Sequence, residues 1–321
     1  MEMNDMLQEM LKDYDISDPD MRDHSVREVL QEIIIYGLSK AGFFRKAAFV
    51  GGTALRVFHG LDRFSEDLDF MLMNPCDFDI KDYFPILEKS LSIFGVRFEV
   101  TEKIRKWSKI AAGEVKASTK ELYMTFFQKE GYSEEMYRTQ LTKIKLEIDT
   151  DPAGQASFEW KVRTRPFIHE VAVCDMPSLF AGKMHALLFR GWGNIVKGRD
   201  LYDYLFYASQ KIPFNINFLN EKMKKTGFTE RDLTFEEITG MLKKRFIEID
   251  YGSAIRDTLP YVGVDKKEEV KKWSSELFIQ TVGDLRCEGT FTFQGEYVDN
   301  GSLAHARMKR NRKGIPPRYA R

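Results

Sequence analysis

The chain has few cysteines and histidines and no long apolar run. Its 321 residues include three cysteines, Cys76, Cys174 and Cys287, which lie far apart and form no C-x-x-C pattern. Scattered cysteines in odd number are typical of a reducing compartment, and with five scattered histidines they exclude the common zinc patterns. Because no stretch approaches ~18 consecutive apolar residues and the start is acidic and polar, we expect a cytoplasmic protein without a signal peptide or membrane span.

The chain also lacks an excess of charge of either sign. Lys plus Arg and Asp plus Glu each number 49, so the formal net charge is zero. A balanced charge gives no overall attraction to nucleic acid, and any RNA binding must come from local patches. The basic tail over 307–321 is one such patch, with seven Lys or Arg residues and no acid. It is a disordered end, a phosphate-binding arm for RNA or residues added for expression, and the sequence leaves these interpretations open.

A glycine turn follows a short apolar segment. Residues 47–50 predict a buried strand, and Gly51 and Gly52 come directly after it. Two glycines let the backbone adopt positive φ and approach a ligand closely. Thr53 is expected to cap a short helix over 54–59, whose free N–H groups and partial positive charge suit phosphate. We therefore predict a phosphate-binding turn made by Gly51, Gly52 and Thr53.

Two carboxylates come next, where a second apolar strand is expected over 68–73. Asp67 and Asp69 stand at i and i+2, so in a strand they leave the same face, roughly 6.5–7 Å apart at Cα. Magnesium is usually held by one or two carboxylates plus substrate phosphates, and such a pair beside a phosphate site suits Mg²⁺. The alternative is a solvated acidic turn. The glycine turn upstream and the apolar continuation argue against it.

A third carboxylate is expected from the alternating segment over 141–150. Lys143, Lys145, Glu147 and Asp149 share one face of the predicted strand, and apolar residues share the other. Glu147 is favoured because it is central, and Asp149, which adjoins a turn, is the second candidate. A polar face that is simply solvated is the alternative.

These motifs resemble those of a known enzyme family. G-G-T-A-L over 51–55, then Gly60 and Arg63, then S-E-D-L-D-F over 65–70, are similar to the signature of the AbiEii/AbiGii-type nucleotidyltransferase toxins, in the DNA polymerase β-like nucleotidyltransferase superfamily. A-G-K over 181–183 and G-R-D-L-Y-D-Y over 198–204 resemble later segments of this family. The resemblance covers about residues 26 to 208.

The resemblance implies a catalytic role for Lys183, whose charge would face the nucleotide phosphates. Arg190 lies on nearly the same face of the predicted helix. For both residues the alternative is a cation that only extends from a packed helix into solvent.

The resemblance also implies binding roles on either side of the acids. Ser65 could hydrogen-bond phosphate, and Arg63 and Arg199 are expected to help bind the nucleotide. Asp200 would orient Lys183 or contact sugar or base. Arg199 and Asp203 are i, i+4 neighbours and could also be an ordinary helix pair.

Hydrophobic periodicity predicts an α+β fold with a mixed sheet. Strands are expected over 47–50, 68–73, 96–104, 121–127 and 143–149. Helices are expected over 26–41, 81–94, 177–191, 198–209, 216–226, 234–249 and 265–280, with an irregular stretch before Pro177. We predict a nucleotidyltransferase-type catalytic domain over 1–152 with flanking helices, a mainly helical domain over 153–306 that completes the nucleotide and acceptor cleft, and the basic tail over 307–321.

The resemblance implies a metal-dependent nucleotidyltransferase that is the toxin of an AbiE-like toxin–antitoxin or phage-defence system. It would transfer a nucleoside monophosphate from an NTP to RNA, with the tRNA 3′ end favoured, and release pyrophosphate. Asp67, Asp69 and Glu147 would hold Mg²⁺ or Mn²⁺, and a cognate antitoxin would be a partner. The alternatives are transfer to a small molecule such as an aminoglycoside or to a protein, and a non-catalytic nucleotide-binding regulatory module. The intact carboxylate pair argues against the last.

Overall fold

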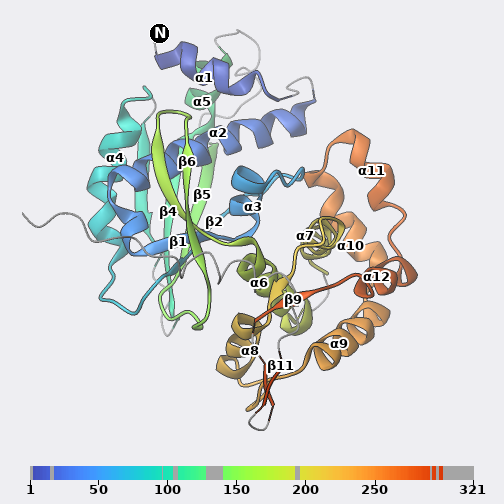
Figure 1. The fold of residues 1–321 in the computed structure, drawn as a ribbon. Helices are drawn as coiled ribbons and strands as arrows, with labels where there is room; N and C mark the ends of the chain where they lie inside the picture. The colour runs from blue at the N-terminus through green and yellow to red at the C-terminus, as the bar shows by residue number, and fades with distance from the viewer. Residues whose placement is uncertain are drawn as a thin grey trace, which may run out of the picture.

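The protein has a lobe built on a β-sheet and a lobe built from helices (Figure 1). The computed structural model describes residues 3–14, 18–95, 97–103, 108–127, 140–191, 196–289, 291–293 and 296–298. The basic tail over 307–321 lies outside the described residues, so the interpretations of this tail stay predictions.

Seven strands form one mixed sheet in the order β3-β4-β5-β2-β1-β7-β6. They are β1 (Ala47–Val50), β2 (Leu68–Leu72), β3 (Phe98–Glu102), β4 (Ile110–Ser118), β5 (Leu141–Asp149), β6 (Phe158–Arg163) and β7 (His169–Cys174). The pairs β2/β5 and β1/β7 are parallel, and the other neighbours are antiparallel. This sheet confirms the predicted fold class.

Helices α1 (Met3–Leu11), α2 (Pro19–Lys40), α4 (Phe84–Ser92) and α5 (Thr119–Phe127) belong to the sheet lobe. Helix α2 contacts β5, β7 and α4, whereas α1 packs on α5. The apolar stripe predicted within 26–41 is confirmed, since Val26, Leu30 and Ile33 are each at most 1% exposed. Burial of this stripe against the sheet holds the strands that carry the acids.

Two predictions for this lobe are wrong, and one strand was missed. The strand expected over 121–127 is helix α5, whose buried residues, among them Leu122, Phe126 and Phe127, recur at helical spacing. Strand β4 was not predicted, because its many small residues give little strand signal. The stretch expected to be irregular before Pro177 contains β6 and β7, so the sheet continues beyond residue 152.

The second lobe is mainly helical, as predicted. It contains α6 (Met176–Phe189), α7 (Gly198–Ser209), α8 (Ile216–Lys225), α9 (Phe235–Glu248), α10 (Tyr251–Thr258), α11 (Val264–Val270) and α12 (Ser275–Val282). Two-stranded pairs join β8 (Phe214–Asn215) to β9 (Cys287–Glu288) and β10 (Phe291–Phe293) to β11 (Glu296–Val298). Short 3-10 helices are η1 (Phe43–Arg45), η2 (Ile80–Tyr83) and η3 (Leu259–Tyr261).

In this lobe one predicted helix is divided in two, and one helix was missed. The single helix expected over 265–280 is divided into α11 and α12, because the Ser274 side chain accepts a hydrogen bond from the Leu277 N–H and begins a new helix. Helix α10 was not predicted and is capped in the same way by Asp250. Within the described ranges, no helix is long and apolar enough to cross a membrane.

Candidate active site

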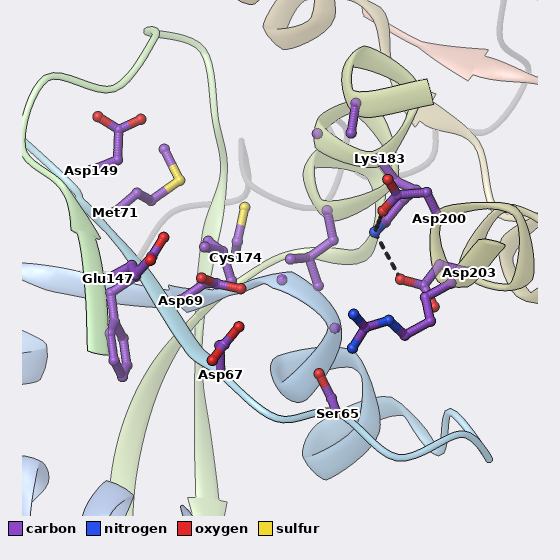
Figure 2. Close-up of a pocket in the computed structure, with 18 of the residues that line it drawn as sticks. Ser65, Asp67, Asp69, Met71, Glu147, Asp149, Cys174, Lys183, Asp200 and Asp203 are labelled. Atoms are coloured by element: carbon purple, nitrogen blue, oxygen red, sulfur yellow. Dashed lines mark hydrogen bonds and ion pairs between the residues drawn. The ribbon is translucent and has the colours of Figure 1, made fainter. Parts of the chain in front are cut away.

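A cavity of about 610 Å³ lies where the two lobes meet. Figure 2 shows acids from the strands on one side, facing Lys183, Asp200 and Asp203 from α6 and α7 on the other. The predicted residues that line it are Gly51, Gly52, Arg63, Ser65, Asp67, Asp69, Glu147, Asp149, Lys183, Arg190, Arg199, Asp200 and Asp203. Thr53 does not line it. Folding therefore brings nearly all the predicted site residues into one cavity.

The strand register places the candidate metal ligands together. In the parallel pair β2/β5, Asp69 lies directly opposite Glu147, so both side chains leave the same face of the sheet. Asp67 stands just before β2, and its Oδ1 is 4.0 Å from Lys145 Nζ. Asp149 lies two residues after Glu147 on β5, opposite Met71 of β2. Its Oδ1 accepts a hydrogen bond of 3.1 Å from the backbone N–H of Asp151 in the following turn. This register favours Glu147 over Asp149 as the third acid.

The acids disfavour one another's charge. Burial, with Asp67 and Glu147 nearby, raises the pKa of Asp69 to about 7. Burial also raises the pKa of Asp67, although Lys145 opposes this. Among the residues that the structure describes, no three Asp, Glu, His or Cys side chains are already close enough together to hold a metal ion. The donor set nevertheless fits a divalent cation, since three carboxylates offer hard oxygen ligands and a cation would relieve their repulsion.

The raised pKa predicts that Asp69→Asn stabilises the metal-free protein at neutral and higher pH. The folded-state pKa of about 7 lies above the ordinary 3.8, so ionised Asp69 destabilises the folded protein. This destabilisation is absent below about pH 4, grows between pH 4 and 7 and is complete above pH 7. One pKa unit corresponds to ~1.4 kcal/mol, so the gain at pH 8 should reach a few kcal/mol.

Thermal unfolding in EDTA from pH 4 to 8.5 measures this gain as the difference in Tm between the variant and the unsubstituted protein. The two Tm values should converge near pH 4. A variant that is less stable at pH 8 would show that the Asp69 charge is not repelled in the fold.

The glycine turn places the first residues of a helix beside the Asp69 carboxylate. Gly51 has φ of 77°, and a Cβ there would lie 2.5 Å from Asp69 Oδ2. A Cβ on Gly52 would lie 2.6 Å from Arg63 Nη2. Helix α3 (Gly51–His59) begins at the turn itself, with Val50 as N-cap and no side chain bonded to its first N–H groups. These N–H donors at the cavity edge suit an anionic ligand.

Thr53 does not have the role expected for it. It lies inside α3 rather than at its cap, is 1% exposed, and donates its hydroxyl to the Asp67 carbonyl at 2.5 Å. The prediction that Thr53 caps the helix is wrong, because the helix starts at Gly51, three residues earlier than expected, and Val50 is its N-cap. The Thr53 hydroxyl instead holds the backbone of Asp67 against α3.

Gly51→Ala is expected to lose most of the nucleotide-dependent activity, since the new methyl group would displace the Asp69 carboxylate. Gly60→Ala is the matched control, because Gly60 has the same φ of 77° but nothing within 4 Å of an added Cβ. Both variants should lose about 1 kcal/mol of stability from the strained backbone. Kinetics and chemical denaturation of the two proteins separate these effects, and equal activity in both would contradict the close fit of Gly51 to Asp69.

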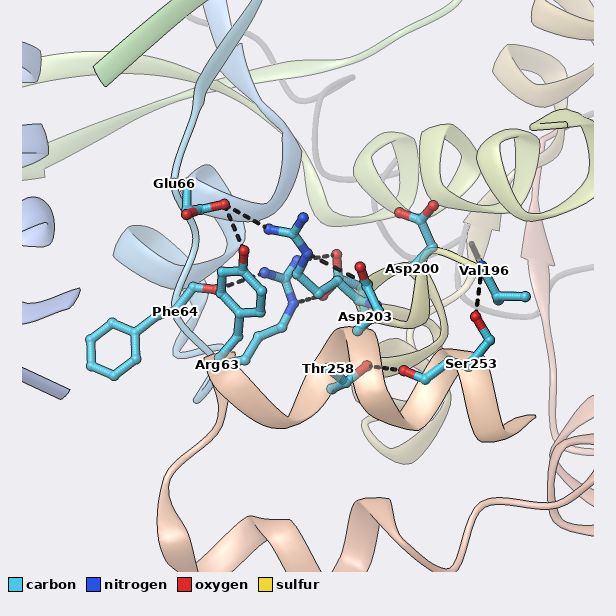
Figure 3. Close-up of polar contacts among 12 residues, drawn as sticks. Arg63, Phe64, Glu66, Val196, Asp200, Asp203, Ser253 and Thr258 are labelled. Atoms are coloured by element: carbon cyan, nitrogen blue, oxygen red, sulfur yellow. Dashed lines mark hydrogen bonds and ion pairs between the residues drawn. The ribbon is translucent and has the colours of Figure 1, made fainter. Parts of the chain in front are cut away.

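A buried ionic network forms the other wall of the cavity (Figures 2 and 3). Lys183 Nζ lies 2.7 Å from Asp200 Oδ1 and 2.8 Å from Asp203 Oδ2. Arg63 donates two bonds of 2.7 Å to Asp203, and Arg190 Nη1 lies 2.6 Å from Asp200 Oδ2. Burial acts against the charge of Lys183, yet the two carboxylates raise its pKa above the ordinary value. Lys183 is therefore held as a cation, and with Arg190 it opposes part of the rise in the pKa of Asp69 that burial and the neighbouring acids cause.

The contacts of two predicted nucleotide-binding arginines indicate supporting roles. Arg63 is 3% exposed and its guanidinium is engaged by Asp203, so it holds the network that positions Lys183. Arg199 Nη1 lies 3.2 Å from Glu66, and its guanidinium stacks 4.1 Å above the Tyr261 ring. The Tyr261 hydroxyl donates to the same carboxylate at 2.8 Å. The i, i+4 pair of Arg199 with Asp203 is not formed.

Lys222 in α8 also lines the cavity and was not predicted. Burial lowers its pKa, and Asp149 opposes this shift. Its Nζ lies 5.3 Å from the Phe218 ring centroid. In the sequence Lys222 is one of several lysines on an amphipathic helix, with no motif around it. The position of α8 beside the cavity was needed to identify it.

Comparison with known proteins agrees with the geometry. The sequence model of the family described as "Nucleotidyl transferase AbiEii toxin, Type IV TA system" matches residues 33–269, well over half of the chain. No curated protein matches the sequence.

Solved structures with similar folds were also found. A candidate nucleotidyltransferase from H. pylori is 19% identical, with 82% of this chain and 92% of that chain covered and a TM-score of 0.47. JHP933 from Helicobacter pylori is 21% identical, with 80% and 87% covered and a TM-score of 0.45. The nucleotidyltransferase toxin MenT4 from Mycobacterium tuberculosis H37Rv is 15% identical, with 88% and 99% covered and a TM-score of 0.44.

The match to the family model spans both the acids and the ionic network. It confirms the predicted family and the predicted nucleotidyltransferase activity. The chain belongs to the AbiEii family of nucleotidyltransferase toxins from type IV toxin–antitoxin systems.

Proposed function

We propose that this toxin is a metal-dependent enzyme that transfers a nucleoside monophosphate from an NTP to RNA and releases pyrophosphate. The observation that carries the proposal is the pairing of three carboxylates with a buried lysine across one cavity. A triphosphate needs cations at its phosphates and oxygen ligands for the metal that accompanies it. This cavity offers both, as well as the free N–H groups at the start of α3.

Each wall of the cavity then has a role. Asp67, Asp69 and Glu147 would hold Mg²⁺, or Mn²⁺ in its place, and the bound cation would neutralise charge on the triphosphate. Lys183 would face the phosphates, and Ser65 could donate a hydrogen bond to them. In the transfer, the acceptor hydroxyl oxygen bonds to the α-phosphorus, the bond to the pyrophosphate oxygen breaks, and a carboxylate of the cluster takes the hydroxyl proton.

For the acceptor we propose RNA, with the tRNA 3′ end as the leading candidate, and therefore action in the cytoplasm. Two cations on the cavity wall support a polyanionic acceptor: Arg190, whose side chain is 48% exposed, and Lys222. A cognate antitoxin is the partner expected from membership of a type IV system. Growth inhibition by RNA modification would account for a role in phage defence.

Incubation of the protein with each α-labelled NTP, Mg²⁺ and total RNA, followed by a denaturing gel, tests the proposal. We expect label on one RNA size class, lost in EDTA and in the Asp69→Asn variant. Label on the protein itself or on a small molecule such as an aminoglycoside, with none on RNA, would contradict the proposed acceptor. NTP binding without any transfer would favour a regulatory module instead.

A further inference from the structure

A second hollow lies next to the active-site cavity, along helices α6 and α8. This hollow, the α6–α8 groove, has a volume of about 670 Å³ and is more open than the cavity. Four residues line both spaces, namely Gly182, Ala186, Arg190 and Lys222. The two spaces therefore adjoin along these four residues, and a chain bound in the groove would have its end beside the cavity.

Small residues keep the groove open. A Cβ added to Gly182 or to Gly227 would meet nothing within 4 Å. Gly227 follows α8 with φ of 74°, which turns the chain so that Phe228 lies at the groove. The groove is thus shaped by backbone features and not only by side-chain positions.

Aromatic rings form the outer part of the groove. Phe228 is 51% exposed, and its ring centroid lies 4.2 Å from that of Phe189. The Phe189 ring in turn lies 5.0 Å from His185, which is neutral at pH 7 because burial and Lys222 lower its pKa to about 4. Phe228 does not belong to the packed core of its lobe, although Phe189 packs against that core. An exposed ring supported by a partly buried one gives a flat, fixed surface.

Cations lie where the groove joins the cavity. Arg190, which pairs with Asp200 in the ionic network, and Lys222 both line the groove and the cavity. Aromatic rings beside basic side chains are the features by which proteins bind unpaired nucleic acid, since each base can stack and each phosphate can meet a cation.

We propose that the α6–α8 groove binds the unpaired end of the acceptor RNA, with a base stacked on Phe228 and its phosphates beside Arg190 and Lys222. This inference rests on the proposed RNA acceptor and names the surface that would receive it. The groove suits the acceptor better than the NTP, because its open outer part lets a long strand extend into solvent. The cavity between the lobes, with its acids and Lys183, remains for the triphosphate.

Direct binding tests the groove without requiring turnover. The probe is a fluorescently labelled single-stranded RNA of about eight nucleotides, measured by anisotropy with the full chain in EDTA. Phe228→Ala should raise the Kd about tenfold, which corresponds to ~1.4 kcal/mol, and Phe228→Trp should retain binding. Trp160→Ala is the control, because Trp160 is 57% exposed on β6 and lines neither the cavity nor the groove. Binding of Mg²⁺ and a non-hydrolysable NTP, measured by calorimetry, should be unchanged in all three variants.

The outcomes separate the groove from the reaction. Phe228-dependent RNA binding by a protein that labels no RNA would support the groove and overturn the proposed reaction. RNA labelling with equal Kd values for Phe228→Ala and the unsubstituted protein would overturn the groove and leave the reaction standing. A loss of NTP binding in Phe228→Ala with unchanged RNA binding would also overturn the inference, as would the absence of RNA binding by the unsubstituted protein.

Discussion

Asp69→Asn is expected to reduce nucleotidyl transfer by at least about 10³-fold, or ~4 kcal/mol of transition-state stabilisation. Asp69 is the central acid of the cluster, since it lies opposite Glu147 on β5 and two residues from Asp67. Asparagine keeps the shape but removes the charge, so the metal would lose its most enclosed ligand. The fold should be retained, because the substitution removes a repelled charge rather than a packing group.

Glu147→Gln and Asp149→Asn extend this comparison to the third acid. Glu147→Gln should lower the rate of nucleotidyl transfer nearly as much as Asp69→Asn does. The rate of Asp149→Asn should stay within about tenfold of that of the unsubstituted enzyme. We expect this order because Glu147 lies opposite Asp69 in the β2/β5 pair, whereas Asp149 lies two residues farther along β5 and accepts a hydrogen bond from the following turn. Initial rates over a Mg²⁺ titration measure the effects. A reversed order would assign the third ligand to Asp149, and full activity of Asp69→Asn would remove the metal site from this position.

Arg63→Ala is expected to lower the free energy of unfolding by about 3–5 kcal/mol, the cost of removing one partner of a buried ion pair. Asp203 is 0% exposed and accepts both Arg63 bonds, so the variant leaves its charge with Lys183 alone. The pair also joins the segment between α3 and β2 to α7 in the other lobe. Lys183 should therefore shift, and activity should fall together with stability.

Arg231→Ala is the matched control for this variant. Arg231 makes a bidentate pair with Glu237, but on the surface, where solvent screening leaves such a pair little net effect on stability. Urea denaturation of the two variants gives the comparison. Replacing both partners, as Arg63→Met with Asp203→Leu, should recover much of the stability without the activity. A loss in Arg63→Ala no larger than in Arg231→Ala would show that the buried pair does not hold the lobes together.

Local patterns sufficed for much of the fold. Strand β5 was predicted from strict alternation and α7 from its motif and periodicity, because these signals arise within ten residues or so. Helix α5 was mistaken for a strand because aromatic residues favour strands and its burial pattern depends on what packs against it. Strands β6 and β7 are stabilised by pairing with each other and with β1, which no local pattern reveals.

The sequence by itself determined the chemistry available at the site: glycines before a helix, two acids at strand spacing and, through the family resemblance, a lysine in a predicted helix. These depend on residue type and on spacing over a few positions. Only the tertiary structure decided which groups face one another. Arg63 meets Asp203 across 140 residues, Glu147 lies opposite Asp69, and Lys222 reaches the cavity from a helix without a motif. The physical reason is that segments far apart in the sequence pair only when the hydrophobic cores of the two lobes form. Formation of these cores depends on the whole chain and not on any local pattern.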